Sequence, residues 1–594
     1  HDLKLINVMN PDGSMSQEAG PLYQGLDRLT CRQKLVENLK EQNFLESVED
    51  HMHSIGHCYR CHTVVEPYVS TQWFVKTKPL AKSAIEAVKS RRIHIVPKLW
   101  ENTYFNWMEN IRDWCISRQI WWGHQIPAWN CPTCEKITVA RETPKVCSHC
   151  QEAGLVQETD VLDTWFSSAL WPFSTLGWPE QTQTLKKFYP TSVLCTGFDI
   201  LFFWVARMIM MGNRFMDNVP FQSVYIHALI RDSEGQKMSK TKGNVINPLT
   251  MMDKYGTDAL RFTLAAFAAQ GRDIKLSEER IEGYRNFCNK LWNASRFVLM
   301  NLDGYDGTCE LASNEKRSTA HRWILSRLNE TCRDVNNALE EFKFNDAASS
   351  IYKFIWNEYC DWFLELSKSH LYGGEGKKET QNILLYVLES CLRLLHPFMP
   401  FITEEIHSKL PETSCSIMKK SFPEFKEKDV DLDAEKTFST VINVVTSVRN
   451  IRGEMNLNPG LNLDLFVRTK HNHETEILKK NTNYINSLAR VSLIESSHTT
   501  KKPRVSASSV CEEMDIFVSL EGKLNFAEEK KRIEKELKKI EKDIIVLEKK
   551  LSNKNFIDNA PPEVIEKNSQ RKQVISEKEA RLRIHLETVD LALS

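Results

Sequence analysis

The spacing of hydrophobic and polar residues predicts a parallel α/β region followed by a helical one. In the first region short apolar runs alternate with helical stretches; Val219–Ile230 has the pattern of a buried strand and Pro248–Phe267 that of a helix. This alternation is typical of a parallel sheet with crossing helices. Further along, Phe342–Leu366 and Glu379–Leu395 carry apolar residues at helical spacing, which predicts an all-helical bundle.

The C-terminal segment has the most regular pattern of the chain. Its apolar residues recur in alternating steps of four and three, with Lys and Glu between them, which is the a/d seam of a coiled coil. Asn559-Ala-Pro-Pro562 interrupts the seam, and a second helical segment follows to about residue 592. Two such helices with a break between them favour an antiparallel hairpin over a coiled coil that joins two chains. The seam consists of Ile533, Leu537, Ile540, Ile544, Leu547 and Leu551.

Three other segments have weaker patterns. Cys31–Gln42 is spaced as an amphipathic helix, and Met514–Leu520 as a strand at the end of a mixed segment. Residues 71–190 are rich in Trp and Pro, which indicates an irregular layer between regular elements.

Length and charge limit the classes of protein to which the chain can belong. A chain of 594 residues is too long for one core, and the usual domain size predicts roughly four units. Its 78 basic and 78 acidic residues cancel, which argues against a protein that coats DNA, so nucleic-acid binding would depend on local patches. No apolar run approaches the ~20 residues that span a bilayer, and no secretion signal is present, so we expect a cytoplasmic protein without a membrane partner.

One short segment has the composition of a phosphate-handling loop. Gly235–Gly243 contains three lysines, follows a strand-like run and precedes a helix. Such a loop can close over a triphosphate, where ammonium groups neutralise the charge that develops on the transferring phosphate oxygens. A lysine-rich loop taken by itself is more often exposed surface, so the assignment depends on the exact residues of the loop.

The loop sequence Lys237-Met-Ser-Lys240 resembles the second signature of class I aminoacyl-tRNA synthetases. Thr241 replaces the usual final Ser and keeps the hydroxyl group. The resemblance implies that Lys237 and Lys240 are catalytic residues, and that Ser239 and Lys240 contact ATP, which enters with Mg²⁺.

Neighbouring strings resemble the second Rossmann half of the same family. In Thr196-Gly-Phe-Asp-Ile200 the resemblance implies that the backbone of Gly197 approaches the adenylate, with Asp199 beside it. His227 matches the His of the family's adenine-side His-Gly pair; here Ala228 follows it, so position 228 is left out of the predicted site. Trp204 resembles the residue that walls the amino-acid pocket, against the alternative of core packing.

Longer strings are similar to the valine-specific members of the family. They are Asp163–Pro179, Ile451–Pro459 and Leu551–Phe556, together with the C-terminal hairpin. The resemblance covers essentially the whole chain and implies a valine–tRNA ligase, which activates valine with ATP to valyl-adenylate and transfers it to tRNA(Val). An isoleucine-type ligase and a non-catalytic tRNA-binding, synthetase-like protein remain as alternatives.

Two cysteine pairs have the spacing of a metal site. Cys131-Pro-Thr-Cys134 and Cys147-Ser-His-Cys150 supply four thiolates on two turns, the ligand set of a structural zinc ribbon. The alternative is four free thiols.

A third pair, Cys58-Tyr-Arg-Cys61, provides only two ligands, with His57 or His62 as an alternative source of a further one. The resemblance implies that its partner pair lies upstream of residue 1, so we expect this second metal site to be incomplete in the chain. The preceding Ser54-Ile-Gly-His57 is similar to the first class I signature, His-Ile-Gly-His, but it leads directly into this cysteine pair. We therefore exclude it from the ATP site.

The resemblance also implies an order of domains and a missing N-terminal part. The chain opens on His1 rather than Met, and the first signature and the editing carboxylates of the family are expected upstream of it. We therefore expect a monomer that neither forms valyl-adenylate nor edits by itself. The expected order is the end of an editing domain (1–50), a connective region with the cysteine pairs (51–190), the second half of a Rossmann catalytic domain (191–280), a helical anticodon-binding domain (281–425), a small α/β subdomain (426–522) and a coiled-coil tRNA-binding hairpin (523–594).

Overall fold

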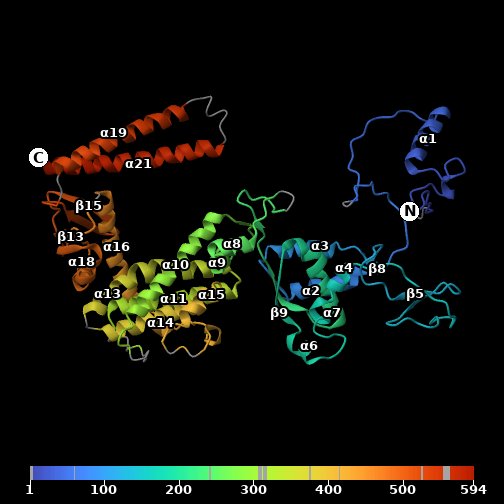
Figure 1. Cartoon of the computed structure of the whole chain (residues 1–594), viewed down its shortest axis with the longest axis horizontal. Coiled ribbons are helices and arrows are strands. Elements are labelled where there is room, and N and C mark those ends of the chain that lie inside the picture. The colour runs from blue at the N-terminus through green and yellow to red at the C-terminus, as the bar shows by residue number, and fades with distance from the viewer. Residues whose placement is uncertain are drawn as a thin grey trace. The chain divides into compact units, whose positions relative to one another are not determined.

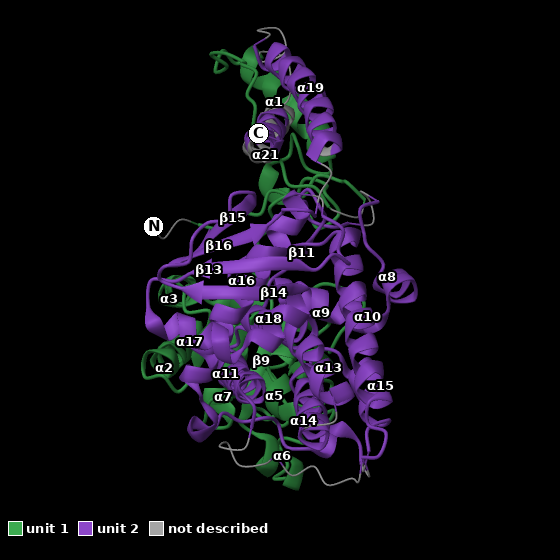
Figure 2. Cartoon of the chain, turned by 90° about the vertical axis from the view of Figure 1, so that its left-hand side faces the viewer, with its two compact units in different colours: residues 1–226 green, residues 227–594 purple. Residues whose placement is uncertain are grey.

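The computed structural model describes most of the chain, and its residues form two compact units, His1–Ile226 and His227–Ser594 (Figure 2). Both α/β and all-helical parts are present, as predicted (Figure 1). None of the described helices is long and apolar enough to cross a membrane. The described residues are 4–58, 61–239, 243–305, 311, 317–373, 376–411, 413, 415–455, 457–523, 526–552 and 562–593.

A three-stranded parallel sheet of order β2-β10-β9 forms the centre of the first unit. Apolar side chains of three helices pack against it, among them the fully buried Ala84, Tyr104 and Ile209. The sheet consists of β2 (His94–Val96), β9 (Thr191–Thr196) and β10 (Phe221–Ile226), and the helices are α2 (Thr77–Lys89), α3 (Trp100–Glu109) and α7 (Arg207–Phe215).

The chain leaves β9 through an irregular helical turn before it enters α7. Gly197 precedes a 3-10 turn, η2 (Phe198–Ile200), and a π-helical turn follows, η3 (Leu201–Ala206). The π-helical turn rotates its side chains relative to those of the α-helix that continues it. Trp204 lies within this turn.

Short strands and helices make up the rest of the first unit, in agreement with the irregular layer predicted there. Strands β1 and β3, β4 and β8, and β6-β5-β7 pair antiparallel. The predicted helix Cys31–Gln42 is present as α1 (Arg28–Glu41). The remaining elements are η1 (Gln17–Ala19), β1 (Phe74–Val75), β3 (Trp114–Cys115), β4 (Ser117–Arg118), β5 (Ala128–Asn130), β6 (Ile137–Val139), β7 (Val156–Gln157), β8 (Val161–Leu162), α4 (Thr164–Ser168), α5 (Trp171–Ser174) and α6 (Gln183–Phe188).

Two predictions were wrong between residues 219 and 267, where the first unit ends and the second begins. The predicted strand Val219–Ile230 ends at Ile226, and Ile230 begins a separate strand, β11 (Ile230–Arg231), which pairs with β12 (Ile274–Lys275). The predicted helix Pro248–Phe267 is two helices, α8 (Pro248–Tyr255) and α9 (Thr257–Phe267). Gly256 separates them because its φ of 93° is outside the helical region.

The helical bundle of the second unit has a large apolar core. The predicted helix Glu379–Leu395 is present almost unchanged as α14 (Lys377–Leu395). The predicted helix Phe342–Leu366 begins at Phe344 and contains a π-helical stretch, η6 (Phe354–Phe363). The other helices are α10 (Glu278–Met300), α11 (Thr319–Glu340), α12 (Phe344–Lys353), α13 (Leu364–Gly373), α15 (Pro400–His407), η7 (Ile417–Lys419) and η8 (Glu427–Asp429).

A small α/β layer follows the bundle. Its four strands have the order β14-β13-β16-β15, and a separate apolar core lies between the sheet and its helices. The predicted strand Met514–Leu520 is present as β16. The elements are α16 (Leu432–Glu454), β13 (Leu463–Arg468), α17 (Asn472–Lys480), α18 (Thr482–Ala489), β14 (Val491–Ser497), β15 (Ser506–Cys511) and β16 (Met514–Ser519).

Two long helices, α19 (Phe526–Leu551) and α21 (Pro562–Leu593), lie side by side at the C-terminal end (Figure 1). Ion pairs join Lys530 to Asp590, Glu541 to Arg583 and Glu548 to Lys572. The partner numbers fall as the α19 numbers rise, so the helices are antiparallel and the predicted hairpin is confirmed. Ile533, Leu537, Ile540 and Leu547 of the predicted seam are buried, and Ile544 and Leu551 are half-buried.

Candidate functional site

The lysine loop follows a tight turn built on Asp232. The Asp232 carboxylate accepts hydrogen bonds from the backbone N–H groups of Glu234, at 3.1 Å, and Gln236, at 2.7 Å. Gly235 has a φ of 85°, which closes the turn. The bonds from Asn244 and the backbone hold the pKa of Asp232 below its usual value, so the carboxylate is charged at neutral pH. The start of the loop is therefore fixed by a local hydrogen-bonded turn.

Asn244 connects the two ends of this loop. Its amide donates to Asp232 Oδ2 at 2.8 Å and to the Lys237 carbonyl at 3.3 Å, and its side-chain oxygen accepts from the Ser239 N–H at 2.9 Å. The Asn244 side chain thus holds the backbone at both Lys237 and Ser239. Lys240, Thr241 and Lys242 of the loop lie outside the described residues. Asp232 and Asn244 were not predicted from the sequence; the Asp-x-x-Gly pattern is a signal for the first.

The remaining predicted nucleotide residues are divided between the two units. His227 opens the second unit, where it is exposed with its Nδ1 3.0 Å from the Ala228 carbonyl oxygen. Gly197 is buried at the carboxyl end of β9 in the first unit, and Asp199 is exposed two residues later. In an open parallel sheet this is the end at which ligands bind. Gly197 and Asp199 therefore lie together in the first unit, whereas His227 belongs to the same unit as the lysine loop.

Trp204 is half-buried against the core of the first unit. Its indole N–H donates to the Ser168 carbonyl at 3.3 Å, and its ring lies 6.0 Å from that of Trp171. A second aromatic pair, Trp165 of α4 and Phe203 of the π-helical turn, packs edge to face with ring centres 4.6 Å apart. Ser168 and Trp171, which lie within the string Asp163–Pro179, thus orient the Trp204 ring.

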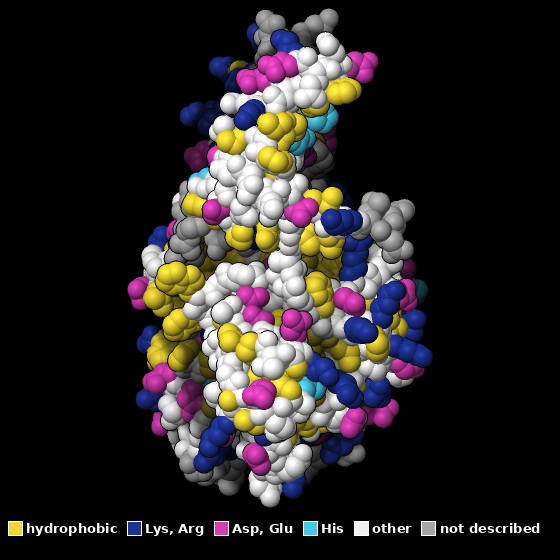
Figure 3. Space-filling model, turned by 90° about the vertical axis from the view of Figure 1, so that its right-hand side faces the viewer, with side chains coloured by type: hydrophobic (Ala, Val, Ile, Leu, Met, Phe, Trp, Pro, Cys, Tyr) yellow, Lys and Arg dark blue, Asp and Glu magenta, His cyan; other side chains and the backbone are white. Residues whose placement is uncertain are grey.

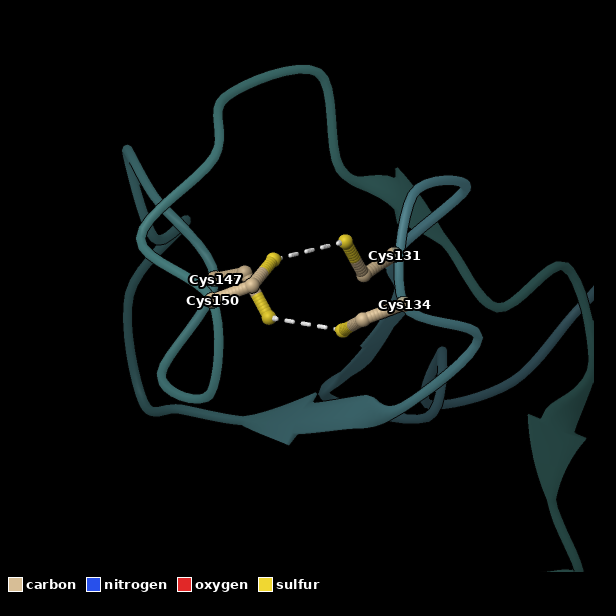
Figure 4. A group of neighbouring side chains, drawn as sticks. All are labelled: Cys131, Cys134, Cys147 and Cys150. Atoms are coloured by element: carbon tan, nitrogen blue, oxygen red, sulfur yellow. Dashed lines mark hydrogen bonds between the residues drawn. The ribbon is translucent and has the colours of Figure 1, made fainter.

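The four cysteines of the predicted zinc ribbon converge (Figure 4). All four sulfur atoms lie within 4.8 Å of one another; Cys131 and Cys150 are 3.5 Å apart, and Cys134 and Cys147 are 3.7 Å apart. A tetrahedral zinc ion with bonds of about 2.3 Å requires sulfur atoms about 3.8 Å apart. Backbone N–H groups of Cys150 and His149 lower the pKa of Cys147 to about 6, which favours the thiolate. The donor set therefore fits a four-coordinate zinc ion with no open position.

Both turns of this ribbon have the same backbone geometry. In one, Cys131 N–H donates to the Lys136 carbonyl and Glu135 N–H to the Cys131 carbonyl; in the other, Cys147 is paired in the same way with Glu152 and Gln151. The residue after the second cysteine of each turn has a positive φ, 58° at Glu135 and 63° at Gln151. This geometry directs both sulfur atoms of a pair to one side.

The third cysteine pair repeats that geometry. Cys58 N–H donates to the Thr63 carbonyl at 2.9 Å, His62 N–H donates to the Cys58 carbonyl at 2.8 Å, and His62 has a φ of 59°. A hydrogen bond with Thr63 lowers the pKa of Cys61 to about 7. Among the described residues, only the ribbon cysteines form a group of three or more side chains that could hold a metal. Cys58 and Cys61 thus have the form of a half-site.

The hairpin presents a row of lysines on α19. A shallow groove there is lined by Lys531, Glu534, Lys535, Lys538, Lys539 and Lys542. On the face that Figure 3 shows, basic and acidic side chains are interspersed. The basic row is thus a local patch in a chain without net charge, of the kind that can contact phosphates.

Three family profiles match successive parts of the chain. The profile described as "tRNA synthetases class I (I, L, M and V)" matches residues 18–277, "Anticodon-binding domain of tRNA ligase" matches residues 321–467, and "Valyl tRNA synthetase tRNA binding arm" matches residues 525–590. A solved methionyl-tRNA synthetase of Mycobacterium tuberculosis, in complex with methionyl-adenylate, aligns over 62% of this chain and 72% of its own, with 16% identity and a TM-score of 0.48.

Two curated relatives have much higher sequence identity. The valine–tRNA ligase of Syntrophotalea carbinolica is 52% identical over 99% of this chain and 66% of its own length. That of Geobacter sulfurreducens is 52% identical over 99% of this chain and 67% of its own length. The chain thus spans about two thirds of the length of these relatives. Identity at this level along the whole chain shows that it belongs to the valine–tRNA ligase family of class I aminoacyl-tRNA synthetases.

Proposed function

We propose that the chain acts as part of a valine–tRNA ligase, which activates valine with ATP and transfers it to tRNA(Val). The observation that carries the proposal is the 52% identity to valine–tRNA ligases over 99% of the chain. An aligned span of 99% of the chain includes the loop, the aromatic helix turn and the hairpin together, which distinguishes the proposal from a match to one motif.

In the activation step, a carboxylate oxygen of valine attacks the α-phosphorus of ATP. The new bond gives valyl-adenylate, and the bond from the α-phosphorus to the bridging oxygen breaks to release pyrophosphate. The carboxylate is already a nucleophile, so positioning and charge stabilisation account for most of the rate. We assign charge neutralisation on the phosphates to Lys237 and Lys240, with Mg²⁺ accompanying the ATP.

We assign the nucleotide contacts to Gly197, Asp199, His227 and Ser239, together with Lys240. Gly197 and Asp199 are at the carboxyl end of β9, a position that supports contact with the adenylate. His227 and Ser239 are assigned to the adenine and to the phosphates, respectively. The hydrogen bond that holds the Ser239 amide to Asn244 at 2.9 Å supports a preformed start of the loop.

We assign one wall of the valine pocket to Trp204. Its indole is anchored to the Ser168 carbonyl, and part of its ring remains exposed. A rigid, partly exposed aromatic surface suits the branched side chain of valine, whose binding is mainly apolar.

We propose one structural zinc ion on Cys131, Cys134, Cys147 and Cys150. Its role is to cross-link the two turns, because four protein thiolates leave no position for a substrate. Cys58 and Cys61 are proposed as half of a second site of the same type. The matching backbone geometry of the three turns supports both assignments.

We assign tRNA binding to the second unit. The bundle at 281–425 is proposed to hold the anticodon side, and the hairpin at 523–594 to lie along phosphates of the tRNA body. The domain matches at 321–467 and 525–590 and the lysine row of α19 support these roles. The predicted domain boundaries, the monomeric state and the cytoplasmic location belong to the same proposal.

Amino-acid-dependent exchange of pyrophosphate into ATP tests this proposal. We would measure it for the chain by itself and for the chain joined to the remaining third of the Geobacter sulfurreducens relative. The proposal requires exchange with valine, and charging of tRNA(Val), in the joined protein. Faster exchange with isoleucine would support an isoleucine-type ligase, and tRNA binding without exchange would support a non-catalytic tRNA-binding protein.

A further inference from the structure

A buried carboxylate, Asp163, lies at the meeting point of three elements of the first unit. Its Oδ2 accepts a hydrogen bond from Trp114 Nε1 at 3.0 Å and lies 3.0 Å from Arg118 Nη2 and 3.7 Å from Arg207 Nη1. The side chain is only 8% exposed. A buried charge of this kind is stable only where its partners remain in place, so the position of each partner is tied to that of Asp163.

One connection runs from Asp163 through α4 to Trp204. Asp163 is the N-cap of α4, where its carboxylate accepts from the Trp165 N–H at 3.5 Å. At the other end of this five-residue helix, the Ser168 carbonyl accepts the Trp204 indole N–H at 3.3 Å. A shift of the cap therefore moves the acceptor that orients the indole.

A second connection runs from Asp163 through Arg207. Arg207 begins α7, directly after the π-helical turn that carries Trp204 three residues earlier. Its guanidinium lies 3.7 Å from the centre of the Trp114 ring, and Trp114 donates to the same Asp163 oxygen. Asp163 thus holds the segment of Trp204 at a second point, and the two connections form a closed ring of contacts.

The charges in this cluster do not cancel. Two guanidinium groups share one carboxylate, and Arg207 is 15% exposed. Burial lowers the pKa of Arg207 to about 10, which still leaves it charged at neutral pH. Arg118 has further acceptors in the carbonyls of Cys115, at 3.0 Å, and Ser117, at 2.8 Å, so Arg207 depends most on Asp163. Removal of the negative charge should release Arg207 first.

We propose that Asp163 is a positioning residue that fixes the orientation of Trp204 through α4 and Arg207, and thereby sets the shape of the amino-acid pocket. The role in the pocket rests on the proposed function, whereas the control of Trp204 by Asp163 concerns this chain alone. The two parts are tested by different measurements.

The first measurement is NMR of the indole groups in the whole chain labelled with ¹⁵N-tryptophan. Signals of Trp204 and Trp114 are assigned from the variants Trp204→Phe and Trp114→Phe. In Asp163→Asn we expect a shifted or doubled Trp204 signal and at least tenfold faster exchange of its N–H with solvent. Asp160→Asn is the matched control, because Asp160 lies three residues earlier and accepts a bond from Gln119 rather than from either arginine. Trp323, in the core of the helical bundle, provides an internal reference.

Arg207→Lys provides a second route to the same result if Asp163→Asn does not fold. It keeps the charge but removes the planar group that faces both Trp114 and Asp163, so the Trp204 signal should change in the same direction. A Trp204 signal that stays unchanged in the folded variants, while that of Trp114 shifts, would overturn the control of Trp204 by Asp163.

The second measurement is pyrophosphate exchange by the joined protein described above. Asp163→Asn should raise KM for valine at least tenfold, change kcat less than threefold and leave KM for ATP unchanged. It should also reduce the preference for valine over isoleucine. An altered Trp204 signal with an unchanged KM for valine would overturn the pocket role. If the unsubstituted joined protein shows no exchange, the proposed function and the pocket role fail together, while the NMR result still decides the control of Trp204.

Discussion

The side chain of Asn244 donates a hydrogen bond to the Asp232 carboxylate at 2.8 Å, across twelve positions of sequence. This contact joins the turn before the lysine loop to the segment after it. The same side chain holds the Ser239 amide. The Asn244 side chain therefore connects the two ends of the loop.

We predict that Asn244→Ala loosens the start of the loop. The amide of Ser239 loses its acceptor, so hydrogen–deuterium exchange of Lys237–Ser239 should be at least tenfold faster. Pyrophosphate exchange by the joined protein should be slower, with little change in tRNA affinity. Asn247→Ala is a suitable control, because Asn247 caps α8 without contacting the loop in the described residues. Equal protection of Ser239 in both variants would contradict this role.

The cysteine ribbon predicts one zinc ion per chain. Cys147→Ser should abolish it, because the substituted hydroxyl is not a thiolate ligand at neutral pH. Metal analysis by mass spectrometry provides the measurement. Cys195→Ser, an exposed cysteine outside the ribbon, should retain the metal. A content of zero or two in the unsubstituted chain would be the contrary result.

The hairpin should unfold locally when its seam is weakened. Ile533 is fully buried between α19 and α21, and its replacement by Ala should destabilise the hairpin by about 2–4 kcal/mol. Ile545 lies on the same helix with 50% of its surface exposed, so Ile545→Ala should cost less than about 0.5 kcal/mol. Hydrogen exchange along α19 would compare the two variants. Similar protection in both would mean that the seam does not hold the helices together.

We predict that His321 makes the stability of the bundle sensitive to acid. Burial lowers the pKa of His321 to about 3, and its Nε2 lies 3.0 Å from Thr380, whose hydroxyl already donates to Gly376. Nε2 must therefore carry the proton of a neutral ring. In the unfolded chain His321 binds a proton below pH 6.5, whereas in the folded chain it stays neutral down to about pH 3. The resulting stability is present above pH 6.5 and is lost as the pH falls toward about 3, by roughly 1 kcal/mol per pH unit.

Urea unfolding of the unsubstituted chain and of His321→Gln at several pH values would measure this effect. The glutamine variant lacks the titrating ring, so its free energy of unfolding should depend less on pH between 6.5 and 4. Parallel pH dependence of the two proteins would assign the acid sensitivity to other groups.

Elements governed by local pattern could be predicted from the sequence. The cysteine turns were predicted because ligand spacing is set within a few residues, and Glu379–Leu395 because its apolar period is long and uninterrupted. Two boundaries were wrong where one residue changes the backbone: Gly256 ends a helix through its positive φ, and β10 stops at Ile226 before Ile230 pairs with β12.

The supporting contacts of the candidate site could not be predicted in this way. Asp163 meets Trp114 across 49 positions, and Trp204 meets Ser168 across 36. Such pairs depend on how several elements pack. The sequence by itself shows only that a carboxylate and an aromatic residue are present. The motif residues could be assigned by resemblance, whereas the residues that orient them required the fold.

The π-helical turn Leu201–Ala206 bears on how this protein can tolerate insertions and deletions. A π-helical turn accommodates one residue more than an α-helical turn of the same length. Deletion of one residue there would be absorbed by a change to α-helix, which keeps α7 in phase with the segment before the turn but moves the side chains within the turn. Trp204 and Arg207 would then no longer face their present partners together. A homologue one residue shorter in this turn should therefore have a different pocket wall, even if its helix and strands are otherwise unchanged.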